Sequence, residues 1–395
     1  MRTSRVGLVA ALAALGTGLG CAAAAAPAPA AGNKTSYTPA VSRDGRYVAF
    51  ASDATNLVAG DTNGKRDIFV RDTVAKKTRR VSIGAGTTQA NGSSFWPKIS
   101  DNGRYVSFIS SATNLVAGDT NAQADAFRVD TTTGAVLRLS VGAGGKQANG
   151  KSANLDMDAT GTKFVFSSTA TNLVTGDTNS TEDVFVRDVT TATTRRISRS
   201  SSGGQITSGT VEMTTISPNA AYVGFVYELP GGRSDLGYQW TRSSNYLSEL
   251  SDAAEYYGSV AGTNHGVAWL AGAYAEGGHC DSQLATAPQA GDPALDVYLG
   301  ECTGHNGQTM DANPAGTMMA VVIGDWGSAT TLYLFDKDLD LWDDAPDGNA
   351  VASLARETIT PALAANGQSV AYADDSGQIR KWTHKTGAIA LISTR

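Results

Sequence analysis

The sequence predicts an all-β chain folded as a β-propeller of seven four-stranded antiparallel blades. Three observations support this fold class: a unit of 58 residues is repeated, short alternating stretches are separated by turn residues, and no segment shows helical periodicity. Repeats of several strands with a period of roughly 40 to 60 residues are typical of propellers. Because the later repeats are weaker, a ring of six or eight blades is the alternative.

The repeat is clearest in a long polar phrase. "TNLVAGDTNGKRDIFVRD" occupies residues 55–72, and close copies occupy residues 113–130 and 171–188. The asparagine of each copy lies 58 residues from the next, and so does the glycine of the turn that precedes it. A β-sandwich would not repeat so regularly, so the spacing indicates duplication of one blade.

The first unit shows the expected strands. "YTPAVS" (37–42) is the innermost strand, and "RYVAFAS" (46–52) alternates with the period of two that is typical of a half-buried strand. "DIFVRD" (67–72) and "RRVSIG" (79–84) complete the blade as its third and outer strands. None of these strands is long enough to be stable alone, so the blades must pack on one another.

Weaker copies of the turn and second strand continue to the C-terminus. We therefore expect one propeller domain over residues 33–395. Its blades are expected to begin near residues 37, 95, 152, 210, 255, 308 and 358. The last repeat contains "IRKWTH" (379–384) and "AIALIS" (388–393), so the first and last blades both look complete. The ring is then expected to close without a borrowed strand, although residues 33–37 could instead pair with the last blade.

The residues also resemble a known family. "VSRDGRYVAFAS", "ISDNGRYVSFIS" and the "NLVxGDTNxxxD" phrase resemble the PD40, or WD40-like, repeats of bacterial TolB-like propeller proteins. The resemblance is strong over residues 37–200 and falls to the turn-strand signature beyond them. It implies an exported propeller that binds other macromolecules, usually without catalysis. TolB carries an additional N-terminal α/β domain for which this chain has no room, which argues against a Tol–Pal role.

Residues 1–32 are predicted to be a signal peptide followed by an Ala/Pro-rich segment. Arg2 and Arg5 precede an apolar stretch over 6–20, and small residues suitable for cleavage follow. The apolar stretch is short for a membrane-spanning helix of roughly 20 residues. We expect an exported protein, secreted or in the cell envelope. The alternative is a lipoprotein anchored through Cys21, because "LGC" resembles part of a lipoprotein signal.

Composition and motifs narrow the function. A net charge of -6 without a basic stretch disfavours nucleic acid. Beyond the leader no apolar run is long enough for a transmembrane helix. The chain lacks a nucleophile elbow, a His-Glu-x-x-His motif and a P-loop, so catalysis has little support. We expect a monomeric, non-catalytic binding or scaffold module for protein or glycan.

Two other classes remain open. One is a secreted carbohydrate-active lyase or hydrolase with its site in the propeller channel, because sequence spacing cannot reveal a carboxylate pair across a channel. The other is a structural propeller stabilised by calcium. A channel with several convergent charged groups would favour the enzyme, and a plain polar or apolar channel the binding module.

The polar half of the repeated phrase predicts a shared rim on one face of the ring. Its Asp and Asn side chains have spacings that resemble the start of a calcium loop, yet the same residue types also stabilise tight turns by bonding their own backbone. Trp96, at the entry to the second blade, is expected to line the rim or the channel. The candidate binding residues are Asp61, Asn63, Asp67, Asp119, Asn121, Asp125, Asp177, Asn179, Asp183 and Trp96.

A second candidate calcium loop lies in "DKDLDLWDDAPD" (336–347). Its aspartates occupy positions 1, 3, 5, 9 and 12 of an EF-hand loop, but Leu341 stands where that loop has glycine. A solvated acidic hairpin is the alternative. The candidate ligands are Asp336, Asp338, Asp340, Asp344 and Asp347.

Cys280 and Cys302 are predicted to form a disulfide. Cys280 precedes one expected strand and Cys302 ends its antiparallel neighbour, and export would place both in an oxidising compartment. Such a bond would contribute roughly 3 kcal/mol. The alternative is a zinc site that also uses His279 and His305.

Overall fold

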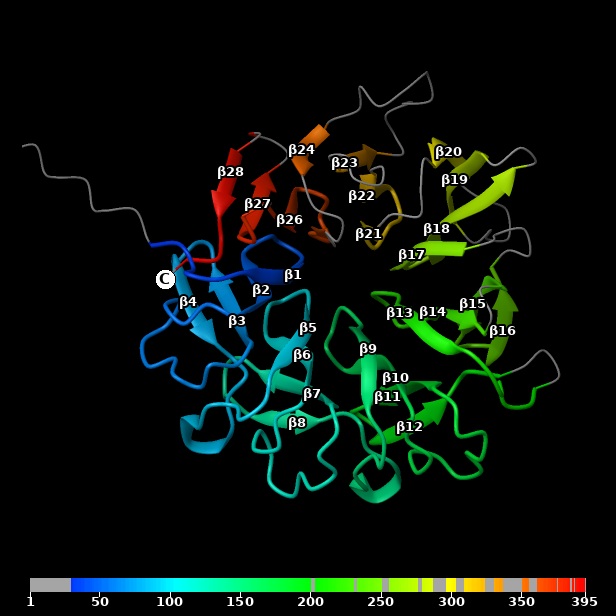
Figure 1. Ribbon diagram of the computed structural model, residues 1–395, viewed down its shortest axis with the longest axis horizontal. Helices are drawn as coiled ribbons and strands as arrows, with labels where there is room; N and C mark the ends of the chain where they lie inside the picture. Colours follow the sequence, from blue (N-terminus) through cyan, green and yellow to red (C-terminus); the bar gives the residue numbers. More distant parts are fainter. Residues whose placement is uncertain are drawn as a thin grey trace, which may run out of the picture.

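The computed structural model describes residues 30–199, 203–230, 233–250, 256–275, 279–286, 296–302, 309–323, 330–336, 350–354, 361–374, 376–383, 386 and 388–394. These residues form seven four-stranded antiparallel sheets, arranged as blades around one axis (Figure 1). The predicted seven-bladed propeller is therefore confirmed. No helix among the described residues is long and apolar enough to cross a membrane.

Each blade consists of four consecutive strands, the first nearest the axis and the fourth at the periphery (Figure 1). In chain order the strands are β1 (Ser36–Val41), β2 (Tyr47–Ser52), β3 (Asp67–Asp72), β4 (Lys77–Arg80); β5 (Ser94–Ile99), β6 (Tyr105–Ser110), β7 (Asp125–Asp130), β8 (Val136–Arg138); β9 (Ser152–Met157), β10 (Lys163–Ser168), β11 (Asp183–Asp188), β12 (Thr193–Arg196); β13 (Thr210–Ile216), β14 (Tyr222–Leu229), β15 (Arg233–Thr241), β16 (Tyr246–Glu249); β17 (Tyr256–Thr263), β18 (Gly266–Ala275), β19 (His279–Thr286), β20 (Asp296–Cys302); β21 (Thr309–Ala312), β22 (Met318–Ile323), β23 (Thr330–Asp336), β24 (Ala350–Leu354); β25 (Ala362–Leu363), β26 (Ser369–Ala373), β27 (Ile379–Thr383) and β28 (Ala388–Leu391). Two short 3₁₀ helices, Ala85–Thr87 and Ala143–Gly145, lie in the connections after blades 1 and 2.

The outer strand of blade 1 differs from its prediction over 79–84. β4 spans Lys77–Arg80, because a tight turn after β3 pairs Asp72 with Lys77 and starts the strand early. After Arg80 the chain leaves the edge of the sheet. The hydroxyl of Ser82 then accepts a hydrogen bond from the backbone N–H of Ile68 and donates one to Asp67.

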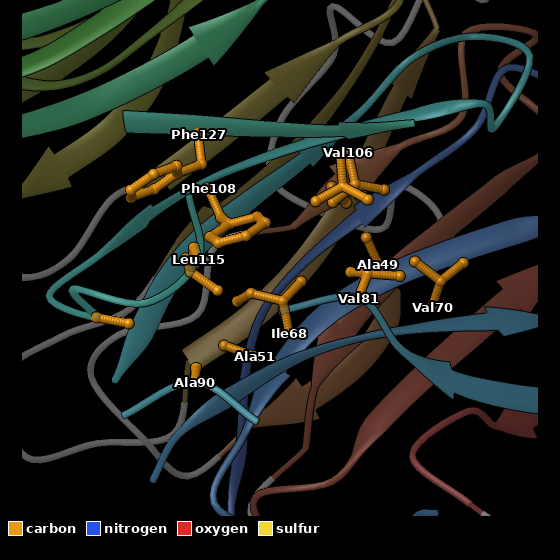
Figure 2. Close-up of a cluster of buried hydrophobic side chains, with 13 residues drawn as sticks. Ala49, Ala51, Ile68, Val70, Val81, Ala90, Val106, Phe108, Leu115 and Phe127 are labelled. Carbon is orange, nitrogen blue, oxygen red and sulfur yellow. The ribbon is translucent and has the colours of Figure 1, made fainter. Parts of the chain in front are cut away.

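The second strands of blades 1 to 4 are buried more completely than an alternating sequence predicts. In β2, Val48 and Phe50 pack with Ala371 and other residues of blade 7, whereas Ala49 and Ala51 pack toward blade 2. Figure 2 shows the second of these interfaces, where small side chains of blade 1 meet Val106 and Phe108. The alternation is therefore one of large and small side chains, because a neighbouring blade covers each face of the sheet.

Turns between the first and second strands hydrogen-bond to one another around the ring. The backbone N–H of Arg43 donates to the backbone carbonyl of Asp101 (3.0 Å). The N–H of Asp101 donates to the carbonyl of Ala159 (2.9 Å), and the N–H of Ala159 to the carbonyl of Pro218 (3.0 Å). The N–H of Asn366 in blade 7 donates to Arg43 in blade 1 (3.2 Å) and continues this pattern across the ends of the chain.

The ring closes without a borrowed strand. Blades 1 and 7 each have four strands of their own, and a single bridge between Ala31 and Thr394 joins the two ends of the chain. The N–H of Gly32 also donates to the carbonyl of Ser393 (2.9 Å). Contacts of the propeller therefore begin at Ala31, two residues before the predicted domain start at residue 33.

Candidate functional site

The repeated polar phrase builds a joint between consecutive blades. In blade 1 the guanidinium of Arg80 lies between two carboxylates, with Nη1 2.9 Å from Asp61 Oδ1 and 3.2 Å from Asp67 Oδ2. The same nitrogen donates to Oε1 of Gln89 (2.9 Å), which belongs to the connection leading to blade 2. We call Asp61, Asn63, Asp67, Arg80 and Gln89, with their equivalents in blades 2 and 3, the interblade joint.

Gln89 and Asn63 tie this loop to the next blade. Oε1 of Gln89 accepts the backbone N–H groups of Thr62 (3.0 Å) and Asn63 (3.2 Å). The amide of Asn63 donates to Asp67 Oδ2 (3.0 Å) and to the carbonyl of Ala90 (3.1 Å). The next asparagine, Asn91, bonds to the start of the following copy of the phrase. One copy of the phrase is thus fastened to the next through residues 89–92.

The charged groups of the joint are buried. The side chains of Asp61, Asp67 and Arg80 are 2%, 0% and 10% exposed. Burial raises the pKa of both carboxyls, and the positive charge of Arg80 opposes this shift. The guanidinium occupies the place between the carboxylates that a bound cation would need.

Blades 2 and 3 repeat the arrangement. Arg138 pairs with Asp119 (3.6 Å) and Asp125 (3.8 Å), and Arg196 pairs with two equivalent aspartates. The structure therefore places the nine Asp and Asn candidates of the predicted rim inside the interblade joints. Their contacts there are Asp61, Asp119 and Asp177 to the arginines, Asp67, Asp125 and Asp183 to the arginines and serines, and Asn63, Asn121 and Asn179 to the latter aspartates.

The other predicted sites lie at the border of the described residues or beyond it. Asp336 ends β23, whereas Asp338, Asp340, Asp344 and Asp347 lie outside the described residues, as do Cys21 and His305. Within the described part of the chain, no group of three or more His, Cys, Asp or Glu side chains is placed to hold a metal ion.

The pairing of two neighbouring strands is compatible with the predicted disulfide. β19 and β20 pair with Cys280 directly opposite Cys302. Opposite residues of an antiparallel pair have Cα atoms about 4.5 or 5.5 Å apart, which a disulfide can span. The bond itself stays a prediction.

A cavity of about 410 Å³ lies on the axis of the propeller, lined by residues of the innermost strands of the blades and, in blade 7, by Pro361 and Ala362. Its size falls in the range of small-molecule sites. In each blade, one residue of the first strand lies at the same level of the channel. Its partner on the second strand follows it by nine residues, or by seven in blade 5. This channel ring consists of Ala40, Lys98, Asp156, Thr215, Ala261, Asp311 and Ala362.

The polar members of the channel ring hold neighbouring blades together. Nζ of Lys98 lies 3.3 Å from Asp156 Oδ1. Oδ2 of Asp156 accepts the hydroxyl of Thr215 (3.0 Å) and the backbone N–H of Ile216 (2.9 Å) in blade 4. Asp311 likewise accepts the N–H of Leu363 in blade 7 (2.8 Å) and that of Ala312 (2.9 Å).

The two aspartates of the channel ring do not have equal environments. Burial raises the pKa of Asp311 to about 6, although the charge of Lys98 and the two backbone donors lower it. The negative charge of Asp156 adds to the rise. In turn, the carboxylate of Asp156 raises the pKa of Lys98. Asp311 is therefore a carboxyl group that titrates near neutral pH inside the channel.

Trp96 lines the cavity as well, and this residue is 46% exposed. A β-bulge between Phe95 and Lys98 gives Trp96 a left-handed backbone (φ 50°), which is rare for a bulky residue. Blades 1 and 3 have the same bulge at Thr38 and Asn154. The prediction that Trp96 lines the channel or the rim is thus resolved in favour of the channel.

Sequence reasoning missed Lys98, Asp156 and Asp311. Each lies five residues before the glycine of a first turn, at Gly103, Gly161 and Gly316. Aligning the seven repeats on those turns would have shown charged residues where blades 1 and 7 have alanine. That alignment was the available signal.

Comparisons with known proteins bear on the fold. No protein-family model matches the chain, and no curated protein matches it. A prolyl endopeptidase has a TM-score of 0.57 at 11% identity, over 91% of this chain and 49% of that one. Oligogalacturonate lyase from Vibrio parahaemolyticus has a TM-score of 0.54 at 14% identity, over 90% of both chains. The β-propeller domain of the Trilobed protease from Pyrococcus furiosus has a TM-score of 0.55 at 11% identity, over 91% of this chain and 98% of that one.

The same comparison also finds TolB. TolB from Acinetobacter baumannii has a TM-score of 0.44 at 11% identity, over 91% of this chain and 64% of that one, a value too low to bear on the family. The chain spans about half the length of the endopeptidase that it resembles. At these identities the similarity shows the fold alone: the chain is a β-propeller, and its PD40 membership stays a prediction.

Proposed function

We propose that this chain is an exported binding module whose ligand, a protein segment or a glycan, enters the central channel. The observation that carries the proposal is the cavity of about 410 Å³ in which Trp96, Lys98, Asp156 and Asp311 converge. Concave sites that combine apolar and aromatic surface with a few polar groups are typical of ligand binding.

Among the described residues, the contacts of Asp311 use part of its acceptor capacity. A carboxylate has about four acceptor positions, and Asp311 accepts two backbone N–H groups. Ala40, Ala261 and Ala362 keep three positions of the ring small. By contrast, the carboxylates of the predicted rim are occupied by the interblade joints, so we favour the channel over the rim.

Export rests on the pattern of residues 1–32, of which 1–29 lie outside the described residues. Secretion and a lipid anchor at Cys21 predict different mature proteins. Mass spectrometry of the protein from its native host would show a cleaved, unmodified N-terminus for the first and a diacylated Cys21 for the second. An uncleaved cytoplasmic chain would contradict export.

The binding proposal is tested by calorimetry with defined ligands. The probes are tetramers of glucose, N-acetylglucosamine, glucosamine and galacturonate, and a library of short peptides. At least one probe is expected to bind, and Trp96→Ala should weaken that binding by at least tenfold. Tyr246→Ala is the matched control, because Tyr246 is also an exposed aromatic residue but lies on the outer strand β16. Binding that survives Trp96→Ala unchanged, or no binding by any probe, would overturn the proposal.

A second candidate function is carbohydrate cleavage in the same channel. The observation that favours it is the pair of channel aspartates, of which Asp311 has a raised pKa and Asp156 is paired with Lys98. Carboxyl groups with unequal environments are the usual acid and base of glycoside hydrolysis. Release of reducing ends or unsaturated sugars from the same tetramers is the assay, with loss in Asp311→Asn expected. If no product forms, the cleavage proposal fails and the binding proposal is unaffected.

Calcium stabilisation is the third proposal, and it rests on residues 336–347. If calcium is bound there, a chelator should lower the melting temperature of the protein and added calcium should restore it. An unchanged melting temperature would contradict a structural role for calcium.

A further inference from the structure

The charged residues that line the channel are unequal in number. Among the described residues lining the cavity, the carboxylates are Asp156, Glu212 and Asp311, and the cation is Lys98. The ion pair of Lys98 is with Asp156 at 3.3 Å. Since Lys98 is paired with Asp156, the ionised carboxylate of Asp311 gives this part of the cavity a negative charge, and charges next to the low-dielectric protein wall interact more strongly than in bulk water.

Asp311 is the carboxylate best placed to receive a cation from outside. Among the described residues, the backbone N–H groups of Ala312 and Leu363 donate to its oxygens and hold the carboxylate against blade 7. Lys98 belongs to blade 2 and Asp311 to blade 6, and the positive charge of Lys98 acts on Asp311 across the channel. Because Lys98 forms its ion pair with Asp156, a ligand that brings an ammonium group into the channel would supply Asp311 with a counter-charge of its own.

Trp96 favours the same chemistry. Trp96 lines the cavity and nearly half of the residue is exposed, and a bulge in the strand sets the conformation of its backbone. An indole face attracts cations, and it also packs against the apolar face of flat polar ligands. A sugar ring with an amino group would use both properties together with hydroxyl donors to the aspartates.

We infer that the channel binds a glycan with free amino groups, of the glucosamine type. This inference rests on the proposed function, because it names the ligand class of that site. Short oligosaccharides suit a cavity of about 410 Å³, which is closed around its circumference by the innermost strands.

The test compares two ligands that differ in charge alone. Calorimetry with the mature protein at pH 6.5, where most of Asp311 is ionised, would measure binding of the glucosamine tetramer and of the N-acetylglucosamine tetramer. The amine-bearing tetramer should bind at least tenfold more tightly, and the preference should weaken as salt is added. Asp311→Asn should reduce the preference to within about threefold, whereas Glu249→Gln, a carboxylate change on the outer strand β16, should leave it intact.

A second variant changes affinity in the opposite direction. Lys98→Met removes the cation of the channel and should tighten binding of the glucosamine tetramer by about threefold or more. Damage to the fold would weaken binding, so tighter binding separates the charge effect from a structural one. Thermal melting of each variant confirms that the protein compared is folded.

The outcomes are distinguishable. Equal or tighter binding of the N-acetylated tetramer overturns this inference and leaves glycan binding in the channel standing. Tighter, Asp311-dependent binding of tetralysine would assign the site to a cationic peptide and overturn the saccharide. If neither tetramer binds and Trp96→Ala affects no other probe, the inference and the proposed function fail together.

Discussion

At the scale of single residues, Arg80 supplies the positive charge that neutralises two buried carboxylates. Its guanidinium lies between Asp61 and Asp67, both of which are buried. A buried carboxylate without a partner is strongly destabilising, because the protein interior cannot replace the lost hydration. The arginine therefore permits two acidic side chains to tie a loop to the next blade.

Removing Arg80 tests this role. Arg80→Met should lower the free energy of unfolding by about 3 to 5 kcal/mol, because two carboxylates lose their buried partner. Urea denaturation measures the change. Lys77→Met, an exposed substitution on the same strand, should cost less than about 0.5 kcal/mol. Equal effects of the two variants would show that the joint contributes little.

Asp311 predicts a pH dependence. Its pKa in the folded protein is about 6 against an ordinary value of 3.8, so between these values the folded protein holds the extra proton. Stability from this group is therefore present at low pH and is lost as pH rises toward 6. The groups that face it are Lys98, Asp156 and the N–H groups of Ala312 and Leu363.

The measurement compares wild type with Asp311→Asn by urea denaturation at pH 4, 5, 6 and 7. Relative to the variant, the wild type should lose at most about 3 kcal/mol between pH 4 and pH 7, as the shift of about two units implies. Parallel pH profiles would show that Asp311 titrates normally in the channel.

At the scale of elements, the first turn of each blade contacts its neighbour. Gly103 has a left-handed backbone (φ 71°), and a Cβ there would overlap with the ring atoms of Tyr47 in blade 1. Gly118 has almost the same backbone (φ 72°) but lies in open space. The first glycine therefore serves both a turn and a close approach between blades, and the second serves a turn only.

Alanine variants of Gly118 and Gly103 separate the cost of backbone strain from the cost of packing. Gly118→Ala should cost about 1 to 2 kcal/mol, the usual penalty for a left-handed alanine. Gly103→Ala should cost a further 1 to 3 kcal/mol, because the added methyl group also displaces Tyr47. The free energies of unfolding of the two variants give the difference directly, and equal losses would show that the turn moves freely away from Tyr47.

At the scale of the whole molecule, the two chain ends form contacts like those of the interblade joint. Elsewhere in the ring, the chain runs continuously from one blade to the next across this joint. Asn33 makes the contacts of Asn91: its N–H donates to Asn56, and its amide donates to Thr55. In blade 7 Gln378 replaces the aspartate of the joint and accepts the hydroxyl of Ser393 (2.7 Å). Leu391 occupies the register position of Arg80, so the carboxylate and the arginine are replaced together.

The chain ends therefore hold the ring closed. A protein that starts at Lys34 should be less stable than one that starts at Ala30 by about 2 to 4 kcal/mol, since it loses several hydrogen bonds of the closure. Urea denaturation of the two proteins tests this. Unchanged stability would mean that packing between blades 1 and 7 suffices without the bridge at Ala31.

The amino-acid sequence by itself determined the strand content, the number of blades and most strand positions. These features follow from local patterns: the alternating stretch "RYVAFAS" (46–52) predicts the strand that the structure has as β2, and glycines mark the turns. The bounds of β4 were not predicted, because Ser82 leaves the edge of the sheet to bond Asp67.

Only the tertiary structure decided the candidate site. Lys98, Asp156 and Asp311 are far apart in sequence, and they share one level of the channel because the blades close into a ring. Asp61 and Asp67 look like surface residues in the sequence, yet Arg80 and Gln89 arrive from other segments and bury them. Periodicity reports which face of a strand is apolar, whereas contacts between distant segments depend on how whole blades pack.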